Sequence, residues 1–156
     1  MASAETRSRL VWQGRRQLVG KTGSGHEVRI DTASANGGDD SAAQPLETFM
    51  TGMGACSAVD VLSILEKMRF TLTSFALDMD APRREEHPRV WRELHLTYEV
   101  ESPDATPEGV RRAVVLSLTR YCSATAMVRP SVPTVVRVRL NGRELEPVDL
   151  AEMADA

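Results

Sequence analysis

The chain has two cysteines, Cys56 and Cys122, and no other thiol. Cys56 lies within the apolar segment 45–68, and Cys122 lies near the end of segment 107–124; both segments have helical character. A cysteine thiolate is a strong nucleophile, and two neighbouring thiols can form a disulfide. One cysteine in each of two helices predicts a single two-thiol site. Two inert cysteines are the alternative, because free cysteine also packs as a small apolar side chain.

Other groups that could do chemistry are scattered. His26, His87 and His95 lie in a turn, a charged loop and the polar face of a strand. Together with Cys56 they lack the spacing of a metal site. The glycine-containing segments lack the strand-to-helix context of a phosphate-binding loop. The sequence therefore predicts neither a metal nor a cofactor.

Composition excludes several classes of function. The chain has 156 residues, of which 42% are hydrophobic, so it can bury a sizeable core as one domain. Its net charge of −3 provides no basic field that would attract nucleic acid or an anionic membrane. The N-terminus lacks the apolar stretch of a secretory signal, and charges interrupt the apolar runs before the ~20 residues of a membrane span. We expect a cytoplasmic protein, since free thiols persist in a reducing compartment.

The period of the apolar residues predicts the elements that position the thiols. Residues 7–31 alternate as strands, residues 75–81 and 91–100 form a long hairpin, and residues 131–140 form a final strand. Two helices begin at prolines, a residue favoured in the first helical turn. The order β-β-β-α-β-β-α-β predicts a single α+β domain over residues 1–156 with mainly antiparallel strands.

Two segments have few apolar residues to anchor them. Residues 32–44 are small, polar and glycine-rich, and residues 145–156 are polar and acidic. We expect both the loop and the tail to be mobile.

Helical periodicity indicates where each thiol points. Val110, Val114, Leu118 and Cys122 recur every four residues, which predicts one stripe that carries Cys122 into the core. In the first helix the apolar residues surround the axis, which is typical of a helix buried on most sides. Small residues around Cys56 would let another backbone approach closely. A second copy of the chain is the simplest cover, so we predict a homodimer with this helix near the interface.

Two motifs resemble those of a known family. The segment PLETFMTGMGACSAVDVLSIL (45–65) resembles the central helix of the OsmC/Ohr family, and RAVVLSLTRYCSATAMV (112–128) resembles its second cysteine motif. The similarity extends to the strand order, to SGHEVRID (24–31) and to REEHPR (84–89), so it covers nearly the whole chain. The resemblance implies an intertwined α+β homodimer, with long buried central helices and active sites at the subunit interface.

The resemblance also implies an antioxidant thiol peroxidase that reduces organic hydroperoxides. Cys56 would be the peroxidatic nucleophile, and Cys122 would resolve the sulfenic acid as a disulfide. An external dithiol, of unknown identity, would then reduce the protein. Activation of the thiol implies an arginine from the N-terminal strands, for which Arg15 and Arg16 are equal candidates, oriented by a glutamate, here Glu47.

The glutamate departs from the pattern of the best-known peroxidases, in which it directly follows the helix proline. Here Leu46 has that place and Glu47 follows it. Nine residues separate Glu47 from Cys56, which is about 180° around a helix at ~100° per residue. A glutamate in a first helical turn also complements the helix dipole. This form resembles a less characterised branch of the family.

Three functions stay open. The first is the peroxidase. The second is a non-catalytic dimer of the same fold that binds a small apolar ligand or senses redox state. The third is a hot-dog thioesterase, although a cysteine occupies the centre of the helix. Near Cys56, Ser57 and Asp60 could tune a pocket, and Asp60 could equally pair across a dimer contact.

Overall fold

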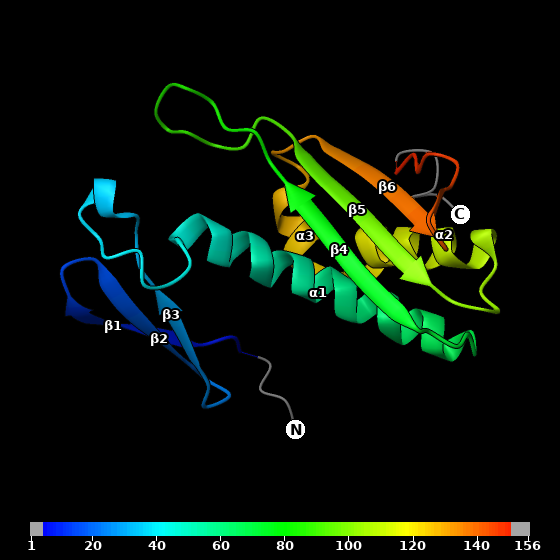
Figure 1. Ribbon diagram of the computed structural model, residues 1–156, viewed down its shortest axis with the longest axis horizontal. Helices are drawn as coiled ribbons and strands as arrows, with labels where there is room; N and C mark the ends of the chain where they lie inside the picture. The colour runs from blue at the N-terminus through cyan, green and yellow to red at the C-terminus, as the bar shows by residue number, and fades with distance from the viewer. Residues whose placement is uncertain (1–4, 151–156) are drawn as a thin grey trace. The chain divides into compact units, whose positions relative to one another are not determined.

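A computed structural model describes residues 5–150 of the chain (Figure 1). The chain divides into two compact units, of which the first ends at Gly52 and the second begins at Met53. Helix α1 (Pro45–Lys67) contributes its first residues to one unit and the rest to the other. Strands and helices are both present in the order that the sequence predicts, so the α+β class is confirmed.

The N-terminal unit is built on a three-stranded antiparallel sheet. Its strands are consecutive in the sheet as in the chain: β1 (Ser8–Gly14), β2 (Gln17–Thr22) and β3 (Glu27–Ile30). Arg15 and Arg16 make the tight turn between β1 and β2, where Gly14 and Arg15 both have positive φ, 118° and 45°. The strands predicted from residues 7–31 are confirmed.

The loop after β3 is organised around the carboxylate of Asp31. This side chain is fully buried, and its oxygens accept hydrogen bonds from the backbone N–H groups of Thr32, Asp39 and Ser41 at 2.8, 3.1 and 3.1 Å. The Ser41 hydroxyl donates a fourth bond of 2.7 Å. A short 3-10 turn (Ser34–Asn36) lies within this loop. The predicted mobility of the loop stays a prediction.

The C-terminal unit contains a four-stranded sheet with the order β4-β5-β6-β7. Its strands are β4 (Ser74–Asp80), β5 (Leu94–Glu101), β6 (Thr134–Leu140) and β7 (Arg143–Glu144). β4 and β5 form the predicted antiparallel hairpin. β5 and β6 are parallel, unlike the other pairs. The helical crossover between them allows this direction, since parallel neighbours need a long connection.

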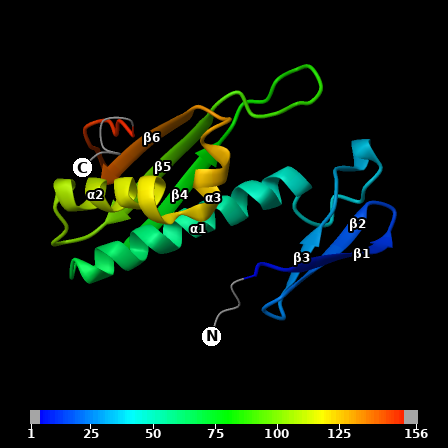
Figure 2. The same ribbon diagram turned by 180° about the vertical axis from the view of Figure 1, so that it is seen from behind.

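Helices cover one face of this sheet. In Figures 1 and 2 the helices of the unit, α2 (Pro107–Leu116), α3 (Ser123–Val128) and the later part of α1, lie on the same side of β4, β5 and β6. Four alternate residues of β5 are buried there: Leu94, Leu96, Tyr98 and Val100. The other face of the hairpin carries the polar residues, as alternation predicts.

α1 is buried along one stripe within the chain. Its buried residues are spaced by about one helical turn: Met53, Gly54, Ser57, Val61 and Leu65. The Val59 side chain, on another side of the helix, is 64% exposed. The described residues of one chain cover only this face of α1, and the predicted burial on most sides, which depends on a second copy of the chain, stays a prediction.

α1 also passes a simple test of length and composition for a membrane span. Its most apolar window has a mean hydropathy of 1.4, and no other described helix reaches the same threshold. Asp60 interrupts the apolar run of α1, as expected, but this test tolerates up to two charged residues in its window. Core helices of soluble proteins pass the same test.

The second predicted helix is interrupted. Thr106 caps α2, since its hydroxyl accepts a 3.1 Å bond from the Gly109 N–H. α2 ends at Leu116, and a π-helical turn (Ser117–Tyr121) follows before α3 begins. The prediction of one helix through residue 124 is wrong here, because the Cys122 N–H bonds to the Ser117 carbonyl, five residues back, at 2.8 Å.

The described part of the C-terminal tail is attached to the unit. The Leu145 N–H donates to the Val138 carbonyl at 2.9 Å, and Arg111 donates to the Pro147 carbonyl at 3.1 Å. Leu150 is buried. The predicted mobile tail also includes residues 151–156, which lie outside the described residues.

Candidate functional site

The two cysteines lie side by side in the C-terminal unit. The sulfur atoms of Cys56 and Cys122 and a carboxylate oxygen of Asp60 all lie within 4.8 Å of one another. Cys56 and Asp60 are one turn apart on α1, while Cys122 comes from the junction before α3. The structure thus brings together the two thiols that the sequence assigned to one site.

The first turn of α3 holds both thiols. Cys122 is the N-cap residue, and its Sγ accepts a 3.4 Å hydrogen bond from the Thr125 N–H. The Ala124 N–H donates to Cys56. The first N–H groups of a helix lack partners within it, so here two of them bind sulfur. Cys122 is buried, as predicted, although the π-helical turn takes it out of the stripe formed by Val110, Val114 and Leu118.

The surroundings of Cys56 disfavour its thiolate form. The Ala124 N–H lowers the pKa of Cys56, but burial and the neighbouring acidic groups of Cys122 and Asp60 together raise it above its ordinary value. The groups of the described C-terminal unit that shift this pKa are Ala124, Cys122 and Asp60, and none of them is a cation. A reactive thiolate at this position requires a positive charge from elsewhere.

Asp60 has an incomplete set of partners. Its Oδ2 atom is buried and makes no hydrogen bond with any described residue. A buried carboxylate oxygen without a partner is costly, so a cation or hydrogen-bond donor bound at this point would stabilise the site. The spacing of four residues from Cys56 is the sequence signal that predicts this proximity.

A buried hydroxyl network lies beneath the thiols. The Ser57 hydroxyl bonds to the Tyr98 hydroxyl at 2.6 Å and to the Ser117 hydroxyl at 2.9 Å. Burial raises the pKa of Tyr98 well above its ordinary value, so it stays protonated. Tyr98 and Ser117 were not predicted here, because they come from β5 and the π-helical turn, far from Cys56 in sequence.

The other predicted site residues belong to the N-terminal unit. Arg15 forms an ion pair with Asp39 and donates to the Gly38 carbonyl at 3.3 Å. Arg16 follows it in the turn between β1 and β2. Glu47 accepts a 2.9 Å bond from the Gln44 N–H and so caps α1, the structural role expected of a first-turn acid. A role for these three residues in activating Cys56 stays a prediction.

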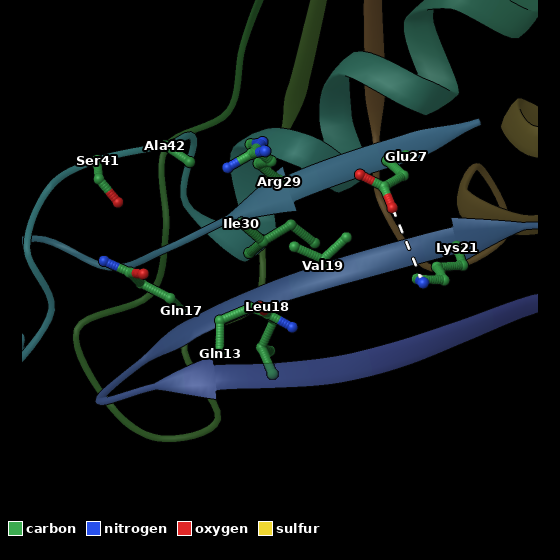
Figure 3. Close-up of a pocket in the computed structure, with 10 residues that line it drawn as sticks. All are labelled: Gln13, Gln17, Leu18, Val19, Lys21, Glu27, Arg29, Ile30, Ser41 and Ala42. Atoms are coloured by element: carbon green, nitrogen blue, oxygen red, sulfur yellow. Dashed lines mark ion pairs between the residues drawn. The ribbon is translucent and has the colours of Figure 1, made fainter.

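Hollows lie in both units. In the N-terminal unit a polar hollow of about 510 Å³ lies over β2 and β3, where Lys21 and Glu27 form a 4.0 Å ion pair (Figure 3). Its lining contains no thiol. In the C-terminal unit a hollow of about 140 Å³ is lined by Cys122 and its neighbours between Leu118 and Ala126. Of these two hollows, only the second is lined by a thiol.

Comparisons with known proteins agree with this architecture. The family model for the OsmC-like protein matches residues 38–137. Protein YhfA of Escherichia coli K12 is 35% identical over 125 residues, which is 80% of this chain and 90% of YhfA.

Solved structures share the fold. A hypothetical protein from Aquifex aeolicus VF5 is 27% identical with a TM-score of 0.78, over 89% of this chain and 98% of that protein. An organic hydroperoxide resistance protein from Legionella pneumophila has the same fold, with a TM-score of 0.64 and 15% identity over 88% of this chain and 98% of its own. These matches favour the OsmC-like fold over the alternative of a hot-dog thioesterase. The chain belongs to the OsmC-like protein family.

Proposed function

We propose that this protein is a thiol-dependent peroxidase that reduces organic hydroperoxides in the cytoplasm. The observation that carries the proposal is the proximity of the two thiols, whose sulfur atoms lie within 4.8 Å in the C-terminal unit. The fold shared with an organic hydroperoxide resistance protein supports it.

The reaction uses Cys56 first and Cys122 second. The Cys56 thiolate attacks the O–O bond of the hydroperoxide, so the alcohol leaves with a proton and a sulfenic acid remains. The Cys122 thiol then attacks the sulfenic sulfur, water leaves, and a disulfide forms. The α-carbons can stay in place only if they lie within ~7 Å, and the sulfurs must close to a bond of ~2.05 Å. A dithiol reductant restores both thiols by exchange.

The site needs a cation, since the pKa of Cys56 is raised. We assign this role to Arg15 or Arg16, from the same chain or a second copy, with Glu47 as the orienting acid. An arginine beside a thiol favours the thiolate by direct charge attraction. Replacing each arginine by methionine separately identifies the activating one, because only that change should slow the reaction with peroxide by about tenfold or more.

The substrate is expected to be small and apolar. The hollow beside Cys122 has a volume of about 140 Å³, below the ~300 Å³ of a pocket for a drug-sized molecule. Tyr121 and Met127 near it are 54% and 75% exposed, so apolar surface borders the thiols. Such surface favours an organic hydroperoxide over hydrogen peroxide.

A homodimer is the second part of the proposal. Val59, Tyr121 and Met127 are large exposed apolar residues on the segments that carry the two cysteines. A second copy of the chain would remove this surface from water and complete the site. Val59→Glu should shift the protein toward monomer in sedimentation, whereas Val90→Glu, in an exposed loop of the same unit, should not.

The deciding measurement is consumption of cumene hydroperoxide with a dithiol reductant. Wild-type protein should be far faster than Cys56→Ser, and Cys122→Ser should complete only one oxidation, leaving a sulfenic acid that dimedone labels. A wild-type rate equal to that of Cys56→Ser contradicts the peroxidase.

That outcome would favour a non-catalytic dimer that binds an apolar ligand or senses redox state. The raised pKa of Cys56 favours the ligand-binding form of this second function, because it leaves little thiolate at neutral pH, whereas redox sensing needs the thiolate.

A further inference from the structure

Three acidic side chains converge on one point in the C-terminal unit. The Sγ atoms of Cys56 and Cys122 and a carboxylate oxygen of Asp60 lie within 4.8 Å of one another. Thiolate and carboxylate are both ligands of Zn²⁺. The histidines, on which the expectation of no metal depends, take no part in this group.

The carboxylate is the unusual member of the group. Asp60 Oδ2 is buried without a hydrogen bond to any described residue, although buried carboxylates are normally paired or bound to a metal. The Ser57 hydroxyl, its neighbour on α1, is already bonded to Tyr98 and Ser117. The nearby hydroxyl network is thus satisfied by its own members, and Asp60 is left facing the two sulfurs.

We propose that the reduced protein binds Zn²⁺ through Cys56, Asp60 and Cys122. Binding releases the thiol protons, so that three negative ligands surround a dication. The fourth position of the tetrahedron is open to water, as in zinc sites with three protein ligands.

The geometry requires a small adjustment. Zn–S and Zn–O bonds of about 2.3 and 2.0–2.2 Å place the ligand atoms of a tetrahedral site about 3.5–3.8 Å apart. The three atoms lie within 4.8 Å of one another, so each pair needs to approach by at most about 1.0–1.3 Å. The two sulfurs also make zinc the better fit than Mg²⁺ or Ca²⁺, which prefer oxygen.

Cobalt titration of the reduced, metal-free full chain tests the site. Wild-type protein should develop a sulfur-to-cobalt charge-transfer absorption that saturates at one ion per chain, and Zn²⁺ should displace it. Cys56→Ser and Cys122→Ser should each weaken this absorption. Asp60→Asn should lower the cobalt affinity by at least ~10-fold, since loss of even an outer partner of a metal ligand costs ~10–100-fold.

Matched controls make the assignment specific. Asp78→Asn removes an exposed carboxylate of the same unit and should titrate as wild type. Zn²⁺ should also raise the melting temperature of wild type and Asp78→Asn, but not of Cys56→Ser. Absence of the charge-transfer absorption in folded wild-type protein overturns the proposal. An unchanged affinity in Asp60→Asn overturns it too, because Asp60 would then serve another partner. No peroxide is present, so neither result depends on the peroxidase.

Discussion

The Ser57 and Tyr98 hydroxyls form a buried 2.6 Å hydrogen bond next to the residue that carries the first thiol. Ser57 comes from α1 and Tyr98 from the centre of β5, so the bond ties the helix to the sheet. Ser117 joins Ser57 from the π-helical turn at 2.9 Å, which links the turn before Cys122 to the same point. The positions of both cysteines therefore depend on this network.

The hydroxyls of this network should contribute unequally to stability, which gives the first prediction. Ser57→Ala leaves the buried Tyr98 hydroxyl without this partner and should lower the free energy of unfolding by about 1–3 kcal/mol. Tyr98→Phe should cost less, about 1 kcal/mol, because Ser57 keeps its bond to Ser117. Urea unfolding followed by circular dichroism compares the two. Equal losses, or a larger loss for Tyr98→Phe, would contradict this view of the network.

Gly54 supplies the second prediction, because it lies against β4. A Cβ atom added at Gly54 would overlap Sδ and Cε of Met79 and lie 3.5 Å from Cδ2 of Leu77. Gly54→Ala forces the flexible end of the Met79 side chain to move, and this overpacking opposes the gain in helix propensity of about 1 kcal/mol, so we expect a net loss of no more than about 1 kcal/mol. In a Met79→Ala background the overlap disappears, so the same change should cost less or stabilise the helix. Additive free energies in this double-mutant cycle would show that the two residues are not in contact.

A third prediction concerns pH and His95 on the polar face of the hairpin. The ring bonds to Glu93 at 2.8 Å and to Asp80 at 2.9 Å, and the Glu93 bond contributes most to raising the pKa of His95. A raised pKa in the folded state means that this contribution is complete below the unfolded value of ~6.5 and is lost as pH rises through the folded value. The effect should be below about 1 kcal/mol, since the Asp80 and Glu93 side chains are 75% and 43% exposed to solvent.

The free energy of unfolding of wild type and of His95→Gln is measured across that pH range. The difference between the two proteins gives the contribution of His95. The difference should shrink toward alkaline pH. A difference that grows as pH rises would contradict the assigned sign.

The fourth prediction is an acid transition of the loop after β3. Hydrogen bonds to Asp31, with that of the Ser41 hydroxyl first, lower its pKa to about 2. A lowered pKa means that the stabilisation is present above the unfolded value of ~3.9 and is lost as pH falls through about 2. Asp31→Asn should destabilise the protein at neutral pH, because an amide nitrogen would face N–H donors.

Asp40→Asn is the matched control for this change. Asp40 is exposed in the same loop with a φ of 54°, a conformation that asparagine tolerates well. Asp40→Asn should leave the stability at neutral pH, and its loss at acid pH, as in wild type. Acid unfolding curves of the three proteins would refute the prediction if Asp31→Asn followed its control.

Local patterns in the sequence predict most of the fold. Alternation alone identifies the buried face of β5, and Pro45 and Pro107 mark the starts of α1 and α2. The parallel pairing of β5 with β6 is not predictable in this way, because strand direction depends on how the crossover packs. The apolar circumference of α1 suggests burial on most sides, but one chain covers only one stripe.

The sequence likewise predicts some features of the candidate site and not others. A four-residue period predicts that Cys122 faces the core. Cys122 is buried, but it does not lie in a continuous helix. The π-helical turn adds a residue that no propensity reveals, and it moves Cys122 to the cap of α3. Asp60 is predictable from its spacing to Cys56. Tyr98 and Ser117 are not, since only tertiary packing brings them to Ser57.

The parallel pairing of β5 and β6 has a consequence for the order of assembly. Residues 102–133 connect the two strands and carry α2, the π-helical turn and α3. Parallel strands joined by so long a crossover pair late, because the entropy of closing the loop is lost before the contacts form. We expect Cys122 to reach Cys56 only once this sheet closes, which pulsed alkylation during refolding can follow. The nascent chain would then be shielded from premature thiol coupling by its own topology.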